Sequence, residues 1–287
     1  MTASSSISGD LERASACLST LRDTDRDRYL ACLLSPEDKR AALAALYAFN
    51  AEIARIRDLV REPLPGEIRL QWWRDLLDGN SSGEGNPVAE ELLVVIEAHR
   101  LPRQTFMNMI DARLFDLYDD PLPDRGALEG YAGETASALI QLASLILAPE
   151  EAAGSADRAG HAGVAQAIAG FLLLLPIHSR RGQMFLPQDI LSATGLDRDA
   201  FLAGERNEQQ VAAVEALAGL GLDHLARARA AGPVPSALVG AYLPVALAGP
   251  VLVKASRHGG LALEGKLLLP QWRRQVQMMK TAFLRRF

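Results

Sequence analysis

Cysteine and aromatic residues are scarce in this chain of 287 residues. The two cysteines, Cys17 and Cys32, form neither a disulfide framework nor a zinc-type spacing, which favours a reducing compartment. Aromatic residues make up 6%, β-branched runs are short, and alanine and leucine are abundant. This balance is typical of packed helices rather than sheets, so we predict an all-α fold.

Long apolar runs and an excess of positive charge are also missing. The longest apolar stretches, 170–177 and 242–253, are shorter than the ~20 residues that cross a bilayer, so any membrane contact should be peripheral. The N-terminal region carries acids and lacks a basic segment before an apolar core, which argues against a secretory signal. The net charge of −5 argues against a general nucleic-acid binder.

Helical periodicity covers most of the chain. A helix is predicted from Pro36 to about residue 60, because apolar residues recur there at steps of three and four. In the next helix, over 67–77, the predicted apolar face includes Ile68, Trp72 and Trp73, and one of these tryptophans should be partly exposed. Further helices are predicted over 88–99, 103–118, 128–147, 158–178, 206–230, 235–258 and 270–285.

No segment alternates apolar and polar residues long enough for a convincing strand, and no linker rich in Pro, Gly or Ser separates two domains. The first nine residues are small and polar, so we expect disorder over 1–9. Residues 10–287 are predicted to form one helical domain.

Five short motifs follow one another along the chain. The first begins at Pro36 and Arg40 and ends in Leu-Tyr-Ala-Phe at Phe49. In this order the motifs resemble those of squalene and phytoene synthases, over about residues 29–191. The remaining four lie at 111–117, 131–136, 163–166 and 182–187.

The resemblance implies an isoprenoid-synthase bundle of helices around a central apolar cavity. In that family, aspartates on two helices at the cavity mouth hold magnesium ions against the diphosphate of a prenyl substrate. Magnesium prefers oxygen ligands, and carboxylates four residues apart share one face of a helix. The metal ions stabilise the departing diphosphate.

The first aspartate motif is degenerate here. The resemblance aligns Asn50, Ala54, Arg55 and Asp58 with this region, and of these four Asp58 alone is a carboxylate. Ala54 cannot bind a metal ion, and Arg55 brings a cation to the place of a divalent ion. An ion pair with a neighbouring arginine is the plainer interpretation of Asp58.

The second motif is altered as well. Leu174 and His178 stand where the family has its aspartates, Gly170 replaces an upstream asparagine, and Gln183 replaces the arginine of a Gly-Arg pair. Residues 171–177 are apolar, so we expect hydrophobic core where the family has a polar cavity mouth. His178 has no carboxylate or cysteine nearby in sequence, which favours a structural role.

These changes lead to expectations for the site. Ala54 and Asp58 should lie near Leu174 and His178 across two facing helices. No metal ion or other cofactor should be bound, and magnesium-dependent turnover of prenyl diphosphates should be absent.

The last part of the chain is basic and amphipathic. No acid follows Glu264, whereas cations are frequent there. In a helix over 270–285 the apolar side chains recur at steps of four, three and four residues, and so share one face. This segment either caps the bundle or forms a membrane or partner surface. The residues proposed for that surface are Trp272, Arg273, Arg274, Lys280 and Phe283.

Within the family, a branch without the aspartate motifs resembles mitochondrial assembly factors of respiratory complex I. The resemblance therefore implies a non-catalytic assembly protein with a partner in a membrane-bound respiratory complex, in the cytoplasm or at the inner face of the membrane. One alternative is a prenyltransferase that uses magnesium, for which Asp58, Asp111 and Asp116 are the remaining carboxylates. Another is a non-catalytic protein that holds an isoprenoid or lipid in the cavity. Asp116 is otherwise expected to be a hydrogen-bonded structural residue.

Overall fold

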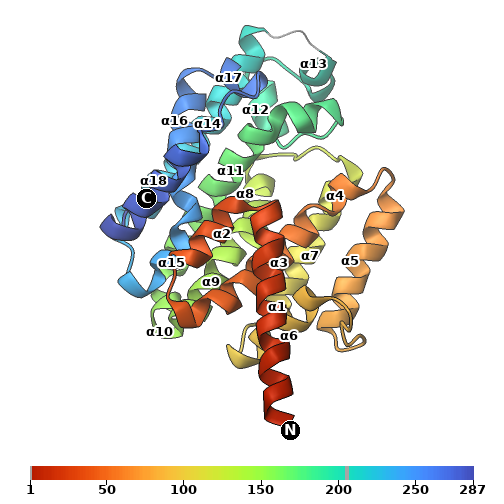
Figure 1. Ribbon diagram of the computed structural model, residues 1–287. Coiled ribbons are helices and arrows are strands. Elements are labelled where there is room, and N and C mark those ends of the chain that lie inside the picture. Colours follow the sequence, from red (N-terminus) through yellow and green to blue (C-terminus); the bar gives the residue numbers. More distant parts are fainter. Residues whose placement is uncertain (1, 204–206) are drawn as a thin grey trace. The chain divides into compact units, whose positions relative to one another are not determined.

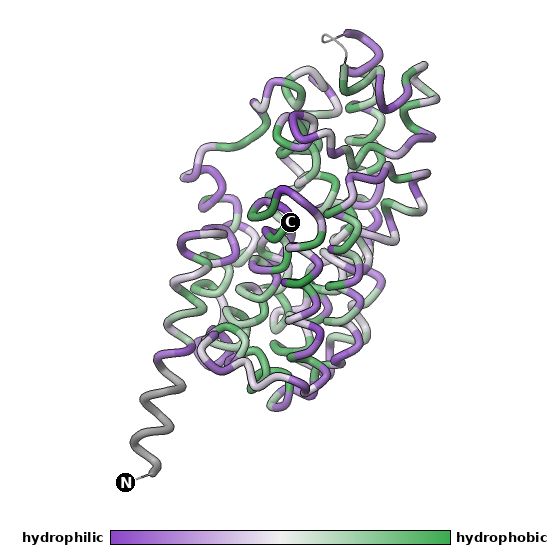
Figure 2. Tube along the Cα trace, turned by 90° about the vertical axis from the view of Figure 1, so that its right-hand side faces the viewer, coloured by the Kyte–Doolittle hydropathy of each residue, from purple (hydrophilic) through white to green (hydrophobic). Residues whose placement is uncertain are grey.

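The computed structural model describes residues 2–203 and 207–287, with side chains described from residue 12 onward. Every regular element in these residues is helical, as Figure 1 shows, so the predicted all-α fold is confirmed. Hydrophobic and hydrophilic residues are mixed along many helices (Figure 2), as expected for amphipathic helices that pack on one side.

The chain divides into two compact units, and each is assembled from three stretches of sequence. Unit 1 comprises the chain up to Tyr118 together with Leu139–Ala153 and Pro235–Ala241. Unit 2 comprises Asp119–Ala138, Gly154–Val234 and Tyr242–Phe287. One domain over 10–287, preceded by disorder over 1–9, stays a prediction.

Unit 1 is built mainly from the first half of the chain. Its central helix, α3, contributes Leu43, Leu46 and Phe49, all fully buried. The ring of Phe49 lies 5.0 Å from that of Trp73 and 5.5 Å from that of Phe106, in edge-to-face arrangements that favour packing. The helices are α1 (Thr2–Thr24), α2 (Arg26–Leu33), η1 (Glu37–Lys39), α3 (Arg40–Ala54), α4 (Ile56–Leu59), α5 (Pro63–Leu77), α6 (Pro87–Ala98), α7 (Arg103–Tyr118), α9 (Ala138–Leu147) and α10 (Pro149–Ala152).

Helix α5 is rotated from its predicted orientation. Trp73 is buried and Trp72 half-buried, as expected for adjacent tryptophans, but Ile68 is 63% exposed, so its assignment to the apolar face was wrong. Gly66 explains the difference, because a Cβ there would lie 2.6 Å from Leu117 Cδ2. The helix turns this glycine toward α7, and the buried face continues through Leu70.

Unit 2 is centred on the long helix α11, which packs against α14 and α16. Asn207 caps α14, since its side chain accepts from the backbone N–H of Gln210 while the Gln210 side chain accepts from that of Asn207. The helices are α8 (Arg125–Ala132), the π-helical turn η2 (Gly133–Ser137), α11 (Ala156–Arg180), α12 (Gln188–Ala193), α13 (Arg198–Ala203), α14 (Glu208–Ala230), η5 (Pro244–Leu247), α16 (Ala248–Arg257), α17 (Gly260–Leu263) and α18 (Gln271–Leu284). Of the three short elements near the unit boundaries, η3 (Ala153–Ser155) begins in unit 1, η4 (Ser236–Leu238) lies wholly in unit 1, and α15 (Val239–Tyr242) lies in unit 1 except for its last residue.

The family-like motif at 163–166 takes part in a close helix contact in unit 2. A Cβ at Gly163 of α11 would lie 2.2 Å from Ser137 Oγ and 2.4 Å from the Ser137 backbone. The Ser137 hydroxyl donates to the carbonyl of Gly160 at 2.8 Å. Only glycine therefore fits at position 163 without displacing η2.

The helix predicted over 235–258 is broken. The elements before and after Leu243 are bent by 54°, and Pro244 stands at the start of the second one. Proline lacks an N–H and clashes with the preceding turn, which accounts for the bend. The helix predicted over 270–285 is present as α18.

The stretch Pro149–Arg180 is long and apolar enough to cross a membrane, judged by length and composition. Of its most apolar window, 44% is buried within the protein. The bent pair Ser236–Tyr242 and Pro244–Arg257 passes the same test jointly. Core helices have the same composition, and α11 packs on α14 and α16.

Candidate functional site

The first degenerate motif lies where one helix stops and another starts. Helix α3 ends at Ala54, Arg55 is its C-cap, and α4 begins at Ile56, so the single helix predicted to about residue 60 was wrong. Asn50 is buried, Ala54 is half-buried, and Arg55 and Asp58 are exposed. The interruption coincides with the backbone of Arg55, whose ψ of −1° differs from the value of about −42° in a regular α-helix.

The second motif lies on α11. Gly170 is half-buried, whereas Leu174 and Ile177 are each 45% exposed. Leu172 and Leu175 point into the core. The prediction that residues 171–177 form only core was therefore wrong, because one side of the helix presents leucine and isoleucine to solvent.

His178 packs within an aromatic cluster at the end of α11. Its ring centroid lies 5.0 Å from that of Phe185, and Phe185 stacks on Phe171 at 4.2 Å. Tyr131 lies 5.7 Å from Phe185. Gln183 is buried, and its backbone N–H donates to the carbonyl of His178 at 3.0 Å. These contacts give His178 and Gln183 a packing environment, in keeping with the structural role expected for His178.

Two of the three carboxylates named for the prenyltransferase alternative are held by arginines. Asp111 of α7 forms an ion pair with Arg74 of α5. Asp116 is buried and accepts from Arg113 at 3.1 Å, as expected for a structural residue.

Helix α18 exposes its apolar stripe. Trp272 is 61% exposed and Phe283 87%, while Val276 and Met279 are also exposed. The guanidinium of Arg273 lies 5.1 Å from the centre of the Trp272 ring, a cation–π contact. On the opposite side, Met278 and Thr281 are buried. The stripe therefore faces outward and does not cap the helical core.

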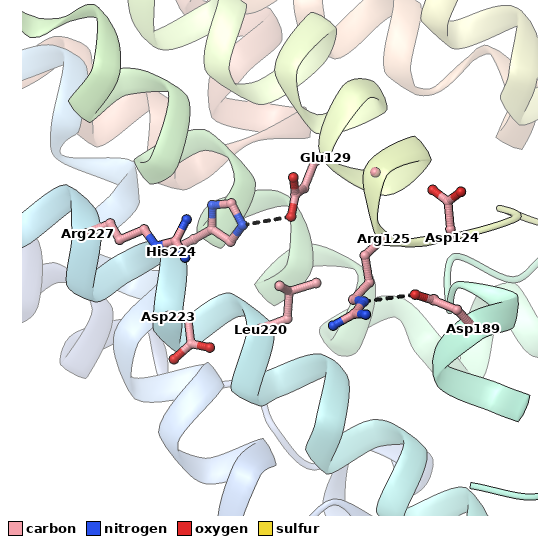
Figure 3. A pocket seen from close by; sticks show the side chains of 9 residues that line it. Asp124, Arg125, Glu129, Asp189, Leu220, Asp223, His224 and Arg227 are labelled. Carbon is pink, nitrogen blue, oxygen red and sulfur yellow. Dashed lines mark hydrogen bonds and ion pairs between the residues drawn. The ribbon is translucent and has the colours of Figure 1, made fainter. Parts of the chain in front are cut away.

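A pocket of about 610 Å³ lies in unit 2 between α8, α12 and α14 (Figure 3). Two contacts tie α8 to its neighbours: Arg125 donates to Asp189 at 2.8 Å, and the His224 ring nitrogen Nε2 lies 3.2 Å from Glu129 Oε1. No pattern in the sequence pointed to this pocket, because its walls come from three separate segments. The lining residues are Asp124, Arg125, Gly126, Glu129, Asp189, Leu220, Asp223, His224 and Arg227.

The sequence model of squalene/phytoene synthase matches residues 21–280. The chain belongs to the squalene/phytoene synthase family. The bovine NADH dehydrogenase (ubiquinone) complex I, assembly factor 6, is 36% identical over 200 residues, which are 68% of this chain and 60% of that protein. A presqualene diphosphate synthase of Sinorhizobium fredii is 26% identical over 172 residues, 58% of this chain and 60% of the enzyme.

Solved structures support the same fold. A dehydrosqualene synthase crystallised with a ligand superimposes with a TM-score of 0.78 at 21% identity and covers 96% of both chains. The predicted isoprenoid-synthase fold is therefore confirmed. This chain spans 60–64% of the length of the mammalian assembly factors that it resembles.

The residues that the resemblance aligns with the family's metal positions do not fit magnesium ions. Ala54 and Leu174 carry no oxygen donor, and Arg55 carries a positive charge. Within residues 12–203 and 207–287, no three His, Cys, Asp or Glu side chains are grouped to hold a metal ion. Helices α3 and α4 belong to unit 1 and α11 to unit 2, so the proximity of Asp58 to His178 stays a prediction.

Proposed function

We propose that this chain is a non-catalytic member of the squalene/phytoene synthase family that serves in the assembly of a membrane-bound respiratory complex of the complex I type. The observation that carries the proposal is the loss of metal and diphosphate ligands on a retained scaffold. The scaffold motifs persist at Phe49 and Gly163, whereas Ala54, Leu174 and Gln183 replace ligating residues. The match to assembly factors of complex I supports the choice of partner.

The alternative of a prenyltransferase is weakened by the environment of its candidate ligands. Asp111 and Asp116 are engaged by Arg74 and Arg113, and Asp58 is an exposed residue of the short helix α4. A magnesium cluster needs several oxygen ligands that are free to converge on the ion. These carboxylates do not meet that requirement.

The experiment is genetic and biochemical. Cells of the source organism that lack the gene should show less assembled complex I on native gels and lower NADH:quinone oxidoreductase activity. Re-expression of the natural chain should restore both. A double variant, Ala54→Asp with Leu174→Asp, should restore them equally well if the ligand positions serve no chemistry. Normal complex I in the deletion strain would overturn the proposal.

We also propose that the protein works at the inner face of the membrane through α18. The exposed stripe of Trp272 and Phe283 lies beside Arg273 and Lys280, and no acid follows Glu264. Aromatic side chains suit the interface of a bilayer, and cations are attracted to anionic headgroups. The surface thus complements an anionic membrane in both polarity and charge.

A further inference from the structure

The pocket of unit 2 has an excess of negative charge. Four carboxylates and two guanidinium groups line it, around the apolar side chain of Leu220 (Figure 3). With His224 neutral, the carboxylates outnumber the cations by two. A pocket of this polarity favours a cationic group, because opposite charges attract most strongly where protein walls displace water.

Part of that charge is already used within the protein. Asp189 accepts from Arg125, and Asp124 accepts from the backbone N–H of Ala127 at 2.8 Å, where it caps α8. Asp223 is different. It is exposed on α14, and no hydrogen bond or ion pair links it to any other residue in the described part of the chain. Its carboxylate is therefore available to a ligand.

The other wall ends in a buried histidine pair. His224 is 94% buried, and its Nδ1 lies 3.0 Å from Nδ1 of His161. Its Nε2 lies 3.2 Å from Glu129 of the pocket. The far nitrogen of His161, Nε2, lies 3.9 Å from Asp157. A row of four titratable side chains thus runs from Glu129 of the pocket through the histidine pair to the exposed Asp157 on α11.

The hydrogen bonds determine where protons sit in this row. An ionised carboxylate only accepts, so His224 Nε2 carries a hydrogen and donates to Glu129. Neutral His224 then has a bare Nδ1, which accepts from Nδ1–H of His161. The remaining lone pair is on His161 Nε2, which faces Asp157. One added proton fits at that nitrogen without breaking a hydrogen bond, whereas a second would place two N–H groups against each other.

We propose that this pocket binds a cationic amine or guanidinium group, and that binding is coupled to release of one proton from the His161–His224 pair. Glu129 connects the two events, since it lines the pocket and accepts from His224. A proton on the histidine pair reduces the negative electrostatic potential in the pocket. It therefore weakens binding of the cation. By thermodynamic reciprocity, a bound cation lowers the affinity of the histidine pair for that proton.

The charges around the pair agree with this coupling. Burial lowers the pKa of His224, and Arg227 and His161 lower it further, while Glu129 raises it. Asp157 faces His161 from the same helix, and Asp223 neighbours His224 on α14. A cation in the pocket adds to the influence of Arg227. The proposal does not depend on a role in complex I assembly.

The test uses titration calorimetry on the full chain with two probes. N-acetyl-arginine amide represents a side chain of a protein partner, and spermidine represents a free polyamine; N-acetyl-glutamine amide is the neutral control. We expect one cation to bind and the neutral probe not to bind. Stronger binding by the arginine amide identifies a protein partner as the source, and stronger binding by spermidine identifies a small molecule. Absence of binding by both cations overturns the proposal.

Two substitutions test whether the cation binds in this pocket. Asp223→Asn should lower the affinity for the cationic probe at least about fivefold, because it removes the available carboxylate. Asp199→Asn, on the exposed side of α13, is the matched control and should leave affinity unchanged. Equal effects of the two variants would contradict the location.

The coupling has its own readout. Affinity should rise by about threefold from pH 5.5 to pH 7.5 as the pair loses its proton. His161→Gln should flatten this profile, since glutamine donates to His224 but does not titrate. A flat profile in the natural chain overturns the coupling, and so does an unchanged profile in a His161→Gln variant with a native circular dichroism spectrum.

Discussion

The ring of Phe287 stacks on that of Tyr242, with centroids 5.6 Å apart and planes within 4°. Arg229 Nε also donates to the carbonyl of Phe287 at 2.5 Å, and Thr281 Oγ1 donates to the carbonyl of Arg286 at 2.9 Å. The segment after α18 is therefore fastened to unit 2. The helix presents its outer stripe from a fixed position, which makes that surface testable by point substitutions.

The first prediction concerns membrane binding by α18. The protein should co-sediment with vesicles that contain about a third of anionic lipid, and less so as salt rises, because each cation near the surface contributes roughly 1 kcal/mol that salt screens. Changing Phe283→Ser and Lys280→Glu together should abolish binding without loss of stability, since both side chains are exposed.

The control for this experiment is Val94→Ser in α6, which removes an exposed apolar side chain from unit 1. It should bind vesicles like the natural chain. Deleting α18 would be a poorer test, because the buried side chains of Met278 and Thr281 would be lost with it. Salt-independent sedimentation would contradict the prediction.

The second prediction concerns chemistry. Purified protein given farnesyl or geranylgeranyl diphosphate with magnesium should form no presqualene diphosphate, squalene or phytoene, because Ala54 and Leu174 supply no metal ligand. Product analysis by chromatography and mass spectrometry, with an active dehydrosqualene synthase in parallel, measures this. A product that depends on magnesium would sink the assignment as a non-catalytic protein.

The third prediction concerns packing in unit 2. Gly163→Ala should lower the free energy of unfolding by about 1–3 kcal/mol, because the new Cβ overlaps the Ser137 backbone. Gly170→Ala on the same helix has no atom within 4 Å of its Cβ and should raise stability by about 0.5–1 kcal/mol. Urea unfolding of both variants gives the comparison, and equal midpoints would refute the close-contact argument.

The fourth prediction concerns pH. Burial lowers the pKa of His224 in the folded protein below its usual value near 6.5, so the unfolded chain binds more protons in that range. The corresponding contribution to stability is present above about pH 6.5 and is lost as pH falls through that range towards the folded pKa. Thermal unfolding from pH 7.5 to pH 5 should show a falling midpoint, with a smaller fall in His224→Gln. An equal fall in both proteins would assign the effect to other groups.

Features encoded within a few residues were predictable from the sequence. Helix α7, predicted over 103–118, and the stripe of α18 both follow from local spacing. The family motifs indicated the fold, because close contacts such as that of Gly163 need one residue type. The orientation of α5 was missed, since the role of Gly66 depends on Leu117, which lies far along the chain.

In the candidate sites, too, features that depend on residues far apart in the sequence were not predicted. The absence of carboxylates at Ala54 and Leu174 was clear from the sequence, because it needed only the identity of the residues. The break at Arg55 was not, since the surrounding residues have helical periodicity. The pocket around Glu129 and His224 was not predictable, because it joins segments that no local pattern connects.

The interleaving of the two units has a consequence for synthesis on the ribosome. Gly240 belongs to unit 1, and a Cβ there would lie 2.4 Å from the hydroxyl of Ser35, near the opposite end of that unit's sequence. Unit 1 therefore cannot finish folding until residues 235–241 have left the ribosome, although most of its residues leave much earlier. Its apolar helices lack their last partner during that interval, so the nascent chain should depend on chaperones until residues 235–241 have emerged.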